Sequence, residues 1–379
     1  MKVLFLTTNN FFKGSDGGNQ YNYQNFSRLQ TIFGQESVNA ICFVKETETQ
    51  EIKENVRYFR ENTARKVRLL SALTQRIYYD RQTEEQVLQY LRAEKFDCIV
   101  LDSLGGRWAR IVKKDNPNTK ILMIPHNCEK MYYRARMEKE GLHLLPLYLG
   151  VVKSERDVVC YADWMSVINE RDQKQFEHEY GRKADLILPV SFADTFEKSK
   201  IHTGATKRGL LFIGSLFAPN LDGIRWFVRN VMPKLPEYKL TIVGKGFEKE
   251  RDALESDNVQ VVGTVSDLSE YYYRYPAIVA PIRYGSGMKV KTCEALMYGK
   301  TLFASDESLE GYEVEGVKGI YRCNTPDEYV TEIQHFYEQE NVPFFQPDVR
   351  ALFMKKYANE VVQQKLQKSL KERVFHDYE

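Results

Sequence analysis

Short apolar runs alternate with longer amphipathic stretches along the whole chain. In its first half the apolar runs cover residues 3–6, 38–44, 98–101 and 121–124, and the segments between them mix polar and apolar positions at helical spacing. This alternation predicts a parallel sheet covered by helices. A fifth run at 186–190 is expected to close that sheet, and the Arg-, Glu- and Tyr-rich region 130–180 is expected to be helical.

The alternation stops at a polar stretch, 197–208, and then starts again. We interpret that stretch as a linker. Beyond it the pattern predicts strands at 209–213, 240–243, 259–262, 277–282 and 300–304, with helices at 220–232 and 267–273. The final stretch, 348–375, has helical composition with few breakers. Two successive alternations predict an α/β protein with two doubly wound domains.

Composition narrows the class of protein. A chain of 379 residues is too long for a single hydrophobic core of ordinary size. Its 54 basic residues nearly balance its 52 acidic ones, which argues against a nucleic-acid binder driven by overall charge. Its six cysteines show no paired spacing typical of zinc, so we expect no metal and a reducing compartment. Polar residues follow the first apolar run too soon for a signal peptide, and no run approaches the roughly 20 residues of a membrane span. We expect a cytoplasmic protein.

The most informative segment is 281–300, which follows an apolar run and contains a Gly-rich loop and a helix start. Gly285 and Gly287 allow positive φ, so loop amides can face an anion, while Lys289 and Lys291 add positive charge. Glu294, one to two turns into the helix, could accept hydrogen bonds from ribose hydroxyls. The segment therefore predicts a nucleotide diphosphate site. The alternative is a simple turn with a capping serine.

This succession of strand, Gly-rich turn, basic residues and Glu-Ala resembles the donor-binding signature of glycosyltransferase family 4, the group 1 glycosyltransferases. The resemblance extends to 211–220, 222–228, 242–246 and Pro125-His126-Asn127, in order along nearly the whole chain. It implies the GT-B fold: two Rossmann-like domains facing across a cleft, with a C-terminal helix crossing back to the first. We place the acceptor-binding domain at 1–198, the donor-binding domain at 207–347 and the returning helix at 348–379.

Residues at other predicted strand ends join the candidate site. Gly17 and Gly18 follow the first strand and would let the backbone approach a phosphate or sugar, a flexible loop being the alternative. His126 follows the fourth strand, where the family places a donor-contacting histidine, and could donate a hydrogen bond to a sugar hydroxyl or leaving oxygen. Asn127 and Glu129 are weaker candidates. The further donor-binding candidates are Gly214, Ser215, Lys245, Val265, Arg283, Ser286 and Met288; His126, Lys289 and Glu294 are the catalytic candidates.

The chain departs from the family pattern in two places. Many members carry an arginine and a lysine near Ser215 that neutralise the diphosphate, and this chain lacks them; Lys289 and Lys291, with Arg283, are expected to supply the charge. Asn220 is expected to cap the following helix. The glutamate usually found eight positions before Glu294 is replaced by Ser286, so amides of the Gly-rich loop would contact the donor sugar instead.

The resemblance implies a retaining glycosyltransferase that uses a nucleotide-diphosphate sugar, with a UDP-sugar favoured. Such an enzyme needs neither a cofactor nor a metal ion, and the lack of an Asp-x-Asp pair in a donor loop agrees with this expectation. The acceptor would be a glycan, a lipid-linked molecule or a protein. Basic and aromatic residues at 107–110, 113–114 and 131–136 would allow peripheral contact at the inner face of the membrane, unless they form a solvated helix face. The alternative function is a non-catalytic glycosyltransferase-like subunit that binds sugar nucleotide or glycan and stabilises a partner.

Overall fold

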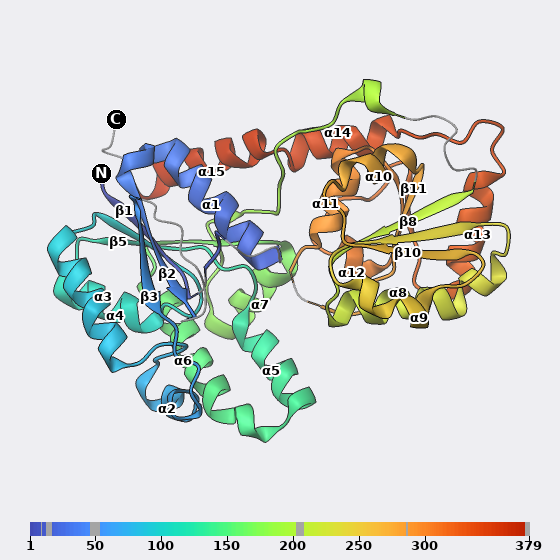
Figure 1. Cartoon of the computed structure of the whole chain (residues 1–379). Coiled ribbons are helices and arrows are strands. Elements are labelled where there is room, and N and C mark those ends of the chain that lie inside the picture. The colour runs from blue at the N-terminus through green and yellow to red at the C-terminus, as the bar shows by residue number, and fades with distance from the viewer. Residues whose placement is uncertain (9, 13–16, 46–53, 202–207, 286, 376–379) are drawn as a thin grey trace. The chain divides into compact units, whose positions relative to one another are not determined.

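The computed structural model describes residues 1–8, 10–12, 17–45, 54–201, 208–285 and 287–375 (Figure 1). The chain forms two compact units. Unit 1 comprises Met1–Leu188 and Gln363–Glu379, and unit 2 comprises Pro189–Val362. The polar stretch 197–208 belongs to the sequence of unit 2, and residues 202–207 lie outside the described ones. The functional domain boundaries at 198 and 207 stay a prediction.

Unit 1 is built on a parallel sheet in which seven strands are described, in the order β3-β2-β1-β4-β5-β6-β7. The strands are β1 Val3–Leu6, β2 Val38–Val44, β3 Val56–Arg60, β4 Cys98–Leu101, β5 Lys120–Met123, β6 Trp164–Val167 and β7 Leu186–Ile187. The five predicted strands are confirmed, the last as two residues only. The interpretation of 130–180 as wholly helical is wrong at β6, and β3 was not predicted. Both are short strands that contain polar residues, so their apolar signal is weak.

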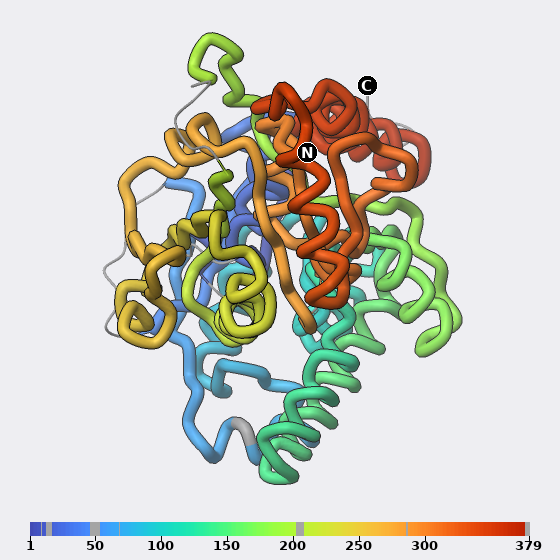
Figure 2. Tube along the Cα trace, turned by 90° about the vertical axis from the view of Figure 1, so that its right-hand side faces the viewer, coloured from blue at the N-terminus to red at the C-terminus, as the bar shows by residue number. Residues whose placement is uncertain are grey.

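Helices cover the sheet of unit 1. The helices of unit 1 are α1 Gly17–Phe33, α2 Arg65–Thr74, α3 Arg81–Glu94, α4 Gly106–Asp115, α5 Glu129–Glu140, α6 Leu145–Tyr161, α7 Glu170–Tyr180 and most of α15 Asn359–Arg373. Trp108 of α4 stacks on Tyr79 in the core between helices and strands, and both are fully buried. In both views α2, α5 and α6 extend to the same end of unit 1 (Figures 1 and 2).

Unit 2 is built on a second parallel sheet, in which the described strands have the order β10-β9-β8-β11-β12-β13. The strands are β8 Gly209–Ile213, β9 Lys239–Val243, β10 Val259–Gly263, β11 Ala277–Ala280, β12 Thr301–Ala304 and β13 Ile320–Arg322. The helices are α8 Ala218–Asn230, α9 Arg251–Leu254, α10 Ser269–Arg274, α11 Val290–Met297, α12 Asp306–Leu309, α13 Pro326–Tyr337 and α14 Pro347–Lys356. The predicted strands and helices of this half are confirmed, and β13 was not predicted.

The second sheet is sandwiched between two layers of helices. Phe227 of α8 packs edge-on against Tyr329 of α13, and both belong to a buried cluster with Phe212 of β8. Helices α10 and α11 lie on the opposite side of the strands (Figure 1). The strand order reverses between β8 and β11, and open α/β sheets bind ligands beyond the carboxyl ends of the strands at such a point. The predicted α/β class with two doubly wound sheets is confirmed.

The terminal stretch forms two helices, α14 and α15, and not one. Phe192 interrupts it: its N–H donates to the carbonyl of Tyr357, and its carbonyl accepts from the N–H of Asn359. These bonds occupy backbone groups that a continuous helix would use. The second helix then returns to unit 1, where the hydroxyl of Ser369 accepts a 3.0 Å hydrogen bond from the indole N–H of Trp164. No described helix is both long enough and apolar enough to cross a membrane.

Candidate functional site

Glycines stand at the carboxyl ends of three strands of unit 2, and they pack against one another: Gly214 follows β8, Gly244 follows β9 and Gly263 ends β10. The N–H of Gly214 donates to Val243, and the N–H of Gly244 donates to Gly263. A Cβ on Gly244, which has φ +146°, would lie 1.9 Å from the carbonyl oxygen of Gly214. A side chain at Gly244 is therefore excluded, and the backbones at the ends of β8 and β9 come into close contact beside the switch point.

The Gly-rich loop connects β11 to α11. Gly287 has φ +63°, in the left-handed region that glycine favours, and Gly285 has φ +155°. Met288 is buried, and Lys289 precedes the first residue of α11, its carbonyl held by the hydroxyl of Tyr312 at 2.8 Å. Ser286 lies outside the described residues. The loop thus leads into a helix N-terminus, where backbone N–H groups favour an anion.

Lys291, in the first turn of α11, reaches the end of β8. Its ammonium donates to the side-chain oxygen of Asn220 and lies 4.5 Å from the centre of the Phe212 ring. A Cβ on Gly214 would lie 2.9 Å from the Lys291 nitrogen, so the glycine leaves room for the lysine. Burial, reinforced by repulsion from Lys289, lowers the pKa of Lys291 to about 7, although Glu294 opposes the shift.

The prediction that Asn220 caps α8 is wrong. The residue preceding α8 is Phe217, and it makes no side-chain cap. Asn220 lies inside the first turn, where Pro219 already supplies a residue without an N–H. Its amide nitrogen donates 2.7 Å to the carbonyl of Ser215, and its oxygen accepts from Lys291. Asn220 therefore joins the loop after β8 to the start of α11.

Lys289 has a carboxylate partner. Its ammonium lies 2.7 Å from Glu307 of α12 and 2.9 Å from the carbonyl oxygen of Gly287. The lysine and glutamate side chains are only 12% and 18% exposed. The two predicted cations of the loop thus differ: Lys289 is balanced by a carboxylate, whereas Lys291 contacts neutral groups.

Glu294 lies one turn further along α11, and its side chain is half-buried. The hydroxyl of Tyr272 donates to it at 3.3 Å, and the Tyr272 ring stacks on Tyr298 at 4.4 Å. Burial raises the pKa of Glu294 to about 7, against the opposing effects of Tyr272 and Lys291. The hydroxyl of Tyr272 thus holds the carboxyl group in place at a half-buried position.

The loops after β9 and β10 are joined by a carboxylate. Glu248 accepts hydrogen bonds from the N–H groups of Gly246 and Thr264, at 3.0 and 3.3 Å. Lys245 is exposed and Val265 half-buried on these two loops. The carbonyl of Lys245 also accepts from Leu216, so the loop after β8 belongs to the same group.

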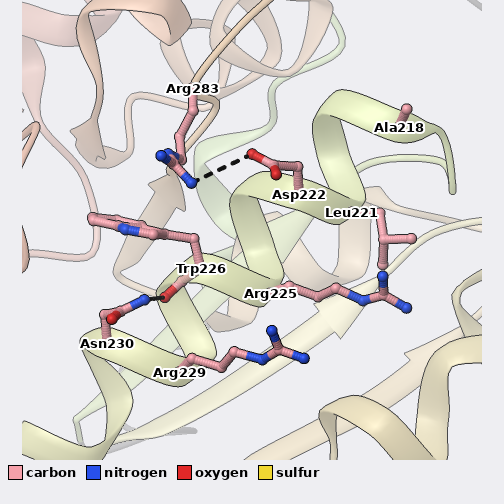
Figure 3. Close-up of a pocket in the computed structure, with 8 residues that line it drawn as sticks. All are labelled: Ala218, Leu221, Asp222, Arg225, Trp226, Arg229, Asn230 and Arg283. Carbon is pink, nitrogen blue, oxygen red and sulfur yellow. Dashed lines mark hydrogen bonds and ion pairs between the residues drawn. The ribbon is translucent and has the colours of Figure 1, made fainter.

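Arg283 lies apart from the other predicted donor residues. Its guanidinium sits 5.7 Å from the centre of the Trp226 ring and 3.8 Å from Asp222, both on α8 (Figure 3). There it lines a cavity of about 430 Å³, whose other lining residues are Ala218, Leu221, Arg225, Arg229 and Asn230. Arg283 is the one residue that this cavity shares with our donor-binding prediction.

In unit 1, side chains from three strand ends meet at the switch point of the first sheet. Asp102 follows β4, and its carboxylate accepts from the N–H of Leu104 at 2.9 Å and from Thr8, after β1, at 3.3 Å. His126 follows β5, with its Nε2 3.4 Å from Glu129. Burial raises the pKa of Asp102, and the charge of His126 opposes that rise. The prediction that His126 lies at the rim of the first sheet agrees with this placement.

The start of α5 behind His126 is held by a buried carboxylate from α6. Glu155, fully buried, accepts from the N–H groups of Glu129 and Lys130 at 2.8 and 3.0 Å and from the hydroxyl of Tyr180 at 2.7 Å. Burial, followed by repulsion from Glu155 and Asp102, raises the pKa of Glu129 well above its ordinary value. Asn127 is also buried. Gly17 and Gly18 form the first turn of α1, which follows β1.

Sequence reasoning missed three residues that touch the predicted ones: Asp102, Tyr272 and Glu307. Asp102 had a signal, because it directly follows a predicted strand at the sheet edge where ligands bind. Tyr272 and Glu307 had none, since each lies on another element far along the chain from its partner. Among the described residues, no group of three His, Cys, Asp or Glu side chains is placed to hold a metal ion.

Comparisons with known proteins agree with this architecture. Residues 207–339 match the family model described as Glycosyl transferases group 1. The chain is similar to the O-antigen biosynthesis glycosyltransferase WbnH of Escherichia coli, with 24% identity over 255 residues that cover 66% of this chain and 70% of WbnH.

Two solved structures show the likeness of fold. Sucrose-phosphate synthase from Thermosynechococcus elongatus superposes with a TM-score of 0.72, at 14% identity, over 100% of both chains. Anabaena HepE in complex with UDP gives a TM-score of 0.70, at 14% identity, over 98% of this chain and 100% of HepE. The two solved structures show that the chain has their fold, GT-B, and residues 207–339 of unit 2 match the group 1 glycosyltransferase family.

Proposed function

We propose that this protein is a group 1 glycosyltransferase that takes its sugar from a UDP-sugar, and that Lys291 and Glu294 of α11 bind that donor. HepE, one structural neighbour, is described in complexes with UDP and with UDP-glucose. WbnH, a sequence relative, is named for O-antigen biosynthesis. These neighbours favour a UDP-sugar donor and a glycan or lipid-linked glycan acceptor, with a protein acceptor as the further class that the family resemblance allows.

The observation that carries the proposal is the buried, uncompensated charge of Lys291. Among the described residues, no carboxylate lies within the 4.0 Å ion-pair distance of its ammonium. A buried cation is costly without an anion, and here it lies beside Gly214 and next to a helix N-terminus. A diphosphate at this position would neutralise the lysine and accept hydrogen bonds from loop amides. Glu294, on the same helix face, would then bind the ribose hydroxyls.

The same groups would assist the reaction. As the bond between the anomeric carbon and the diphosphate oxygen breaks, negative charge grows on the leaving diphosphate. Lys291 and the loop amides bind that charge more tightly in the transition state than in the ground state, which lowers the barrier. This protein charge supports a route without a metal ion or cofactor. Lys289, balanced by Glu307 in this structure, remains a catalytic candidate if the donor displaces that carboxylate.

The stereochemical course follows from the family resemblance. The new bond from the acceptor oxygen to the anomeric carbon forms on the face from which the diphosphate leaves, and the acceptor proton passes to the leaving phosphate oxygen. The anomeric configuration is therefore retained. His126, positioned beside Asp102, would donate a hydrogen bond to a donor sugar hydroxyl. We place the reaction in the cytoplasm, with the acceptor at the inner face of the membrane.

Calorimetric titration of UDP and of inorganic pyrophosphate into four matched variants tests the donor site. Lys291→Met should weaken both ligands at least about tenfold, equivalent to about 1.4 kcal/mol, because both carry the diphosphate. Glu294→Gln should weaken UDP and leave pyrophosphate unchanged, because only UDP has a ribose. Lys289→Met should have a smaller effect, and the exposed Lys318→Met serves as a control.

Equal affinity of UDP for wild type and Lys291→Met would overturn the assignment of the diphosphate site. If GDP, ADP or dTDP bound more tightly than UDP, the site would stand and the choice of base would be wrong. Incubation with a UDP-sugar and acceptor in excess chelator, followed by NMR of the anomeric proton, tests retention and metal independence together. Inversion, or loss of turnover that only a divalent cation restores, would contradict those parts of the proposal.

A further inference from the structure

The cavity beside Arg283 runs along one face of α8 (Figure 3). Its lining residues on this helix recur every three or four positions from Ala218 to Asn230, which places them on a single helix face. We call the cavity between this face and Arg283 the α8 groove. Its volume, about 430 Å³, falls within the range of about 300–1,000 Å³ that small-molecule sites occupy. At about 1.5 Å of rise per residue the face is about 18 Å long, so the groove has room for a few sugar rings.

Trp226 gives the α8 groove an aromatic wall. The chain has three tryptophans, of which Trp108 and Trp164 are fully buried and Trp226 is half-buried. The ring of Tyr329 lies 5.9 Å from that of Trp226, edge to face, and this contact supports the indole from α13. An indole held in this way can pack against the C–H face of a sugar ring, because the apolar C–H groups meet the negative face of the π system.

The charge of the α8 groove is basic. Three arginines line it, against the one carboxylate of Asp222. Arg225 is paired with Glu250, which lies outside the groove, and Arg283 lies 3.8 Å from Asp222, too far for a direct hydrogen bond. Arg229 is exposed, and within the part of the chain that the structure describes no acidic side chain comes within 4.0 Å of it. One positive charge is therefore in excess in the groove.

The polar side chains of the groove are planar. The amide nitrogen of Asn230 donates 2.8 Å to the carbonyl of Trp226, so its side-chain oxygen faces away from this bond and can accept from a hydroxyl group. Guanidinium groups bind carboxylates and phosphates through two parallel hydrogen bonds. An aromatic wall, an amide acceptor and guanidinium donors together match a ligand that has an apolar ring face, hydroxyl groups and a negative charge.

We propose that the α8 groove binds a sugar ring that carries a negative charge, either as one residue of an acidic glycan or as a free sugar phosphate. The ring packs against Trp226, and its carboxylate or phosphate pairs with Arg229 and with Arg283, where it replaces Asp222. Arg283 then serves this groove and not the donor diphosphate. An acidic peptide would use the arginines, but it lacks the ring hydroxyls that match Asn230. The proposal does not depend on the choice of donor, since Trp226 and Arg229 take no part in that site.

Fluorescence titration of the full chain tests the ligand class. The ligands are hyaluronan tetrasaccharide, which carries carboxylates, glucose 6-phosphate, the neutral cellotetraose and inorganic phosphate. At least one of the first two should bind at least about tenfold more tightly than the last two, each of which lacks either the charge or the ring. Preference for the tetrasaccharide assigns a residue of an acidic glycan, preference for glucose 6-phosphate assigns a free sugar phosphate, and similar affinities support the chemistry that they share.

The three tryptophans also locate the ligand. Since Trp108 and Trp164 are buried, the change in emission should come from Trp226, and Trp226→Phe should abolish it. A change in emission that persists in this variant would place the ligand elsewhere and overturn the proposal.

Two charge substitutions should move the affinity for the acidic ligand in opposite directions. Arg229→Glu should weaken binding at least about tenfold, because a charge-assisted hydrogen bond is replaced by repulsion. Asp222→Asn should tighten binding about threefold, because Arg283 loses the carboxylate that competes with the ligand. A folding defect does not produce such a gain. Lys318→Glu, at an exposed lysine outside the groove, controls for total charge and should bind like wild type.

All variants should keep the wild-type circular dichroism spectrum and UDP titration, which separates failure of the groove from failure of folding or of the donor site. The proposal is overturned if neither acidic ligand binds more tightly than cellotetraose, or if Arg229→Glu and Lys318→Glu weaken binding equally. Binding of a glutamate-rich peptide as tightly as the acidic sugars, with the same loss in Arg229→Glu, would likewise overturn it and assign the groove to acidic peptides.

Discussion

Lys289 and Lys291 stand two residues apart in one loop, yet their surroundings give them different properties. Lys289 is balanced by Glu307, and Lys291 lies buried among Asn220, Phe212 and backbone. A lysine whose pKa has fallen to about 7 is largely neutral at pH 8, whereas a bound diphosphate favours its charged form. Ligand binding and proton binding at Lys291 are therefore linked.

This linkage predicts proton uptake when UDP binds. At pH 8 wild type should take up close to one proton per UDP bound, because the diphosphate restores the charge of Lys291. Titration calorimetry in two buffers of different ionisation enthalpy measures that uptake. Lys291→Met should show clearly less uptake, and equal uptake in both proteins would contradict the assignment.

The same residue affects stability in a defined direction. The unfolded chain binds a proton at Lys291 up to a pKa of 10.5, and the folded chain only up to about 7. Between these values the unfolded state holds more protons, so this lysine makes the folded state more stable as pH rises. The difference in unfolding free energy between wild type and Lys291→Met should therefore shift in favour of wild type from pH 7 to pH 10.

At the scale of elements, the start of α5 depends on a carboxylate from another helix. Cys128 precedes α5 without a side-chain cap, and Glu155 of α6 accepts from the first N–H groups instead. This contact fixes the helix that follows His126. It also explains why a glutamate is tolerated at a fully buried position of α6.

Removal of this carboxylate should destabilise unit 1. We expect Glu155→Ala to cost about 2–3 kcal/mol of unfolding free energy, because buried N–H groups of α5 lose their acceptor. Urea denaturation followed by tryptophan fluorescence measures the loss. Glu138→Ala removes an exposed partner of Arg134 and should cost less than about 0.5 kcal/mol. A comparable loss in the two variants would argue against the capping role.

The strands and helices also show where the local sequence pattern predicts secondary structure well. Strands β1, β2, β4, β8 and β9 are short, mainly apolar runs in which nearly every residue is buried, and all were predicted. β3 and β13 were not, because their side chains are half exposed and their sequences alternate weakly. The break between α14 and α15 was missed because Phe192, which causes it, is more than 160 residues away in sequence.

At the scale of the whole molecule, the chain leaves unit 1 at Leu188 and returns to it at Gln363. The returning segment contributes fully buried Leu366, and Phe375 packs edge-on against Phe33 of α1. The core of unit 1 therefore needs residues from both ends of the chain, whereas unit 2 is continuous in sequence.

Weakening the returning helix should loosen one unit only. Leu366→Ala should destabilise unit 1 by about 2–5 kcal/mol through the cavity that it leaves. Hydrogen exchange with mass spectrometry should show faster exchange in unit 1 and wild-type exchange in unit 2. Lys368→Ala, on the exposed side of α15 (75% exposed), is the control. Equal acceleration in both units would mean that the two cores unfold together.

The candidate site likewise has features that the local sequence predicts and others that it does not. The Gly-rich loop, its lysines and Glu294 are adjacent in sequence, so their grouping and even the positive φ of Gly287 could be read from local pattern. The partners of these residues could not. Tyr272, Glu307 and Asn220 reach the site from other elements: Tyr272 holds Glu294, while Glu307 and Asn220 determine which lysine keeps an unbalanced charge.

Exposed leucines make the same distinction for apolar residues, because Leu69, Leu70 and Leu73 of α2 and Leu145 and Leu149 of α6 lie outside the cores. Leucines of α2 and α6 have the same composition signal as those of the cores, and only the packing of α2 on α6 leaves them outside. The chain itself determined the alternation of strands and helices, the two units and the phosphate loop, because these depend on spacing between near neighbours. Charge balance at Lys291, the capping of α5 and the exposure of the leucines were decided by tertiary structure, because burial and pairing depend on residues that only folding brings together.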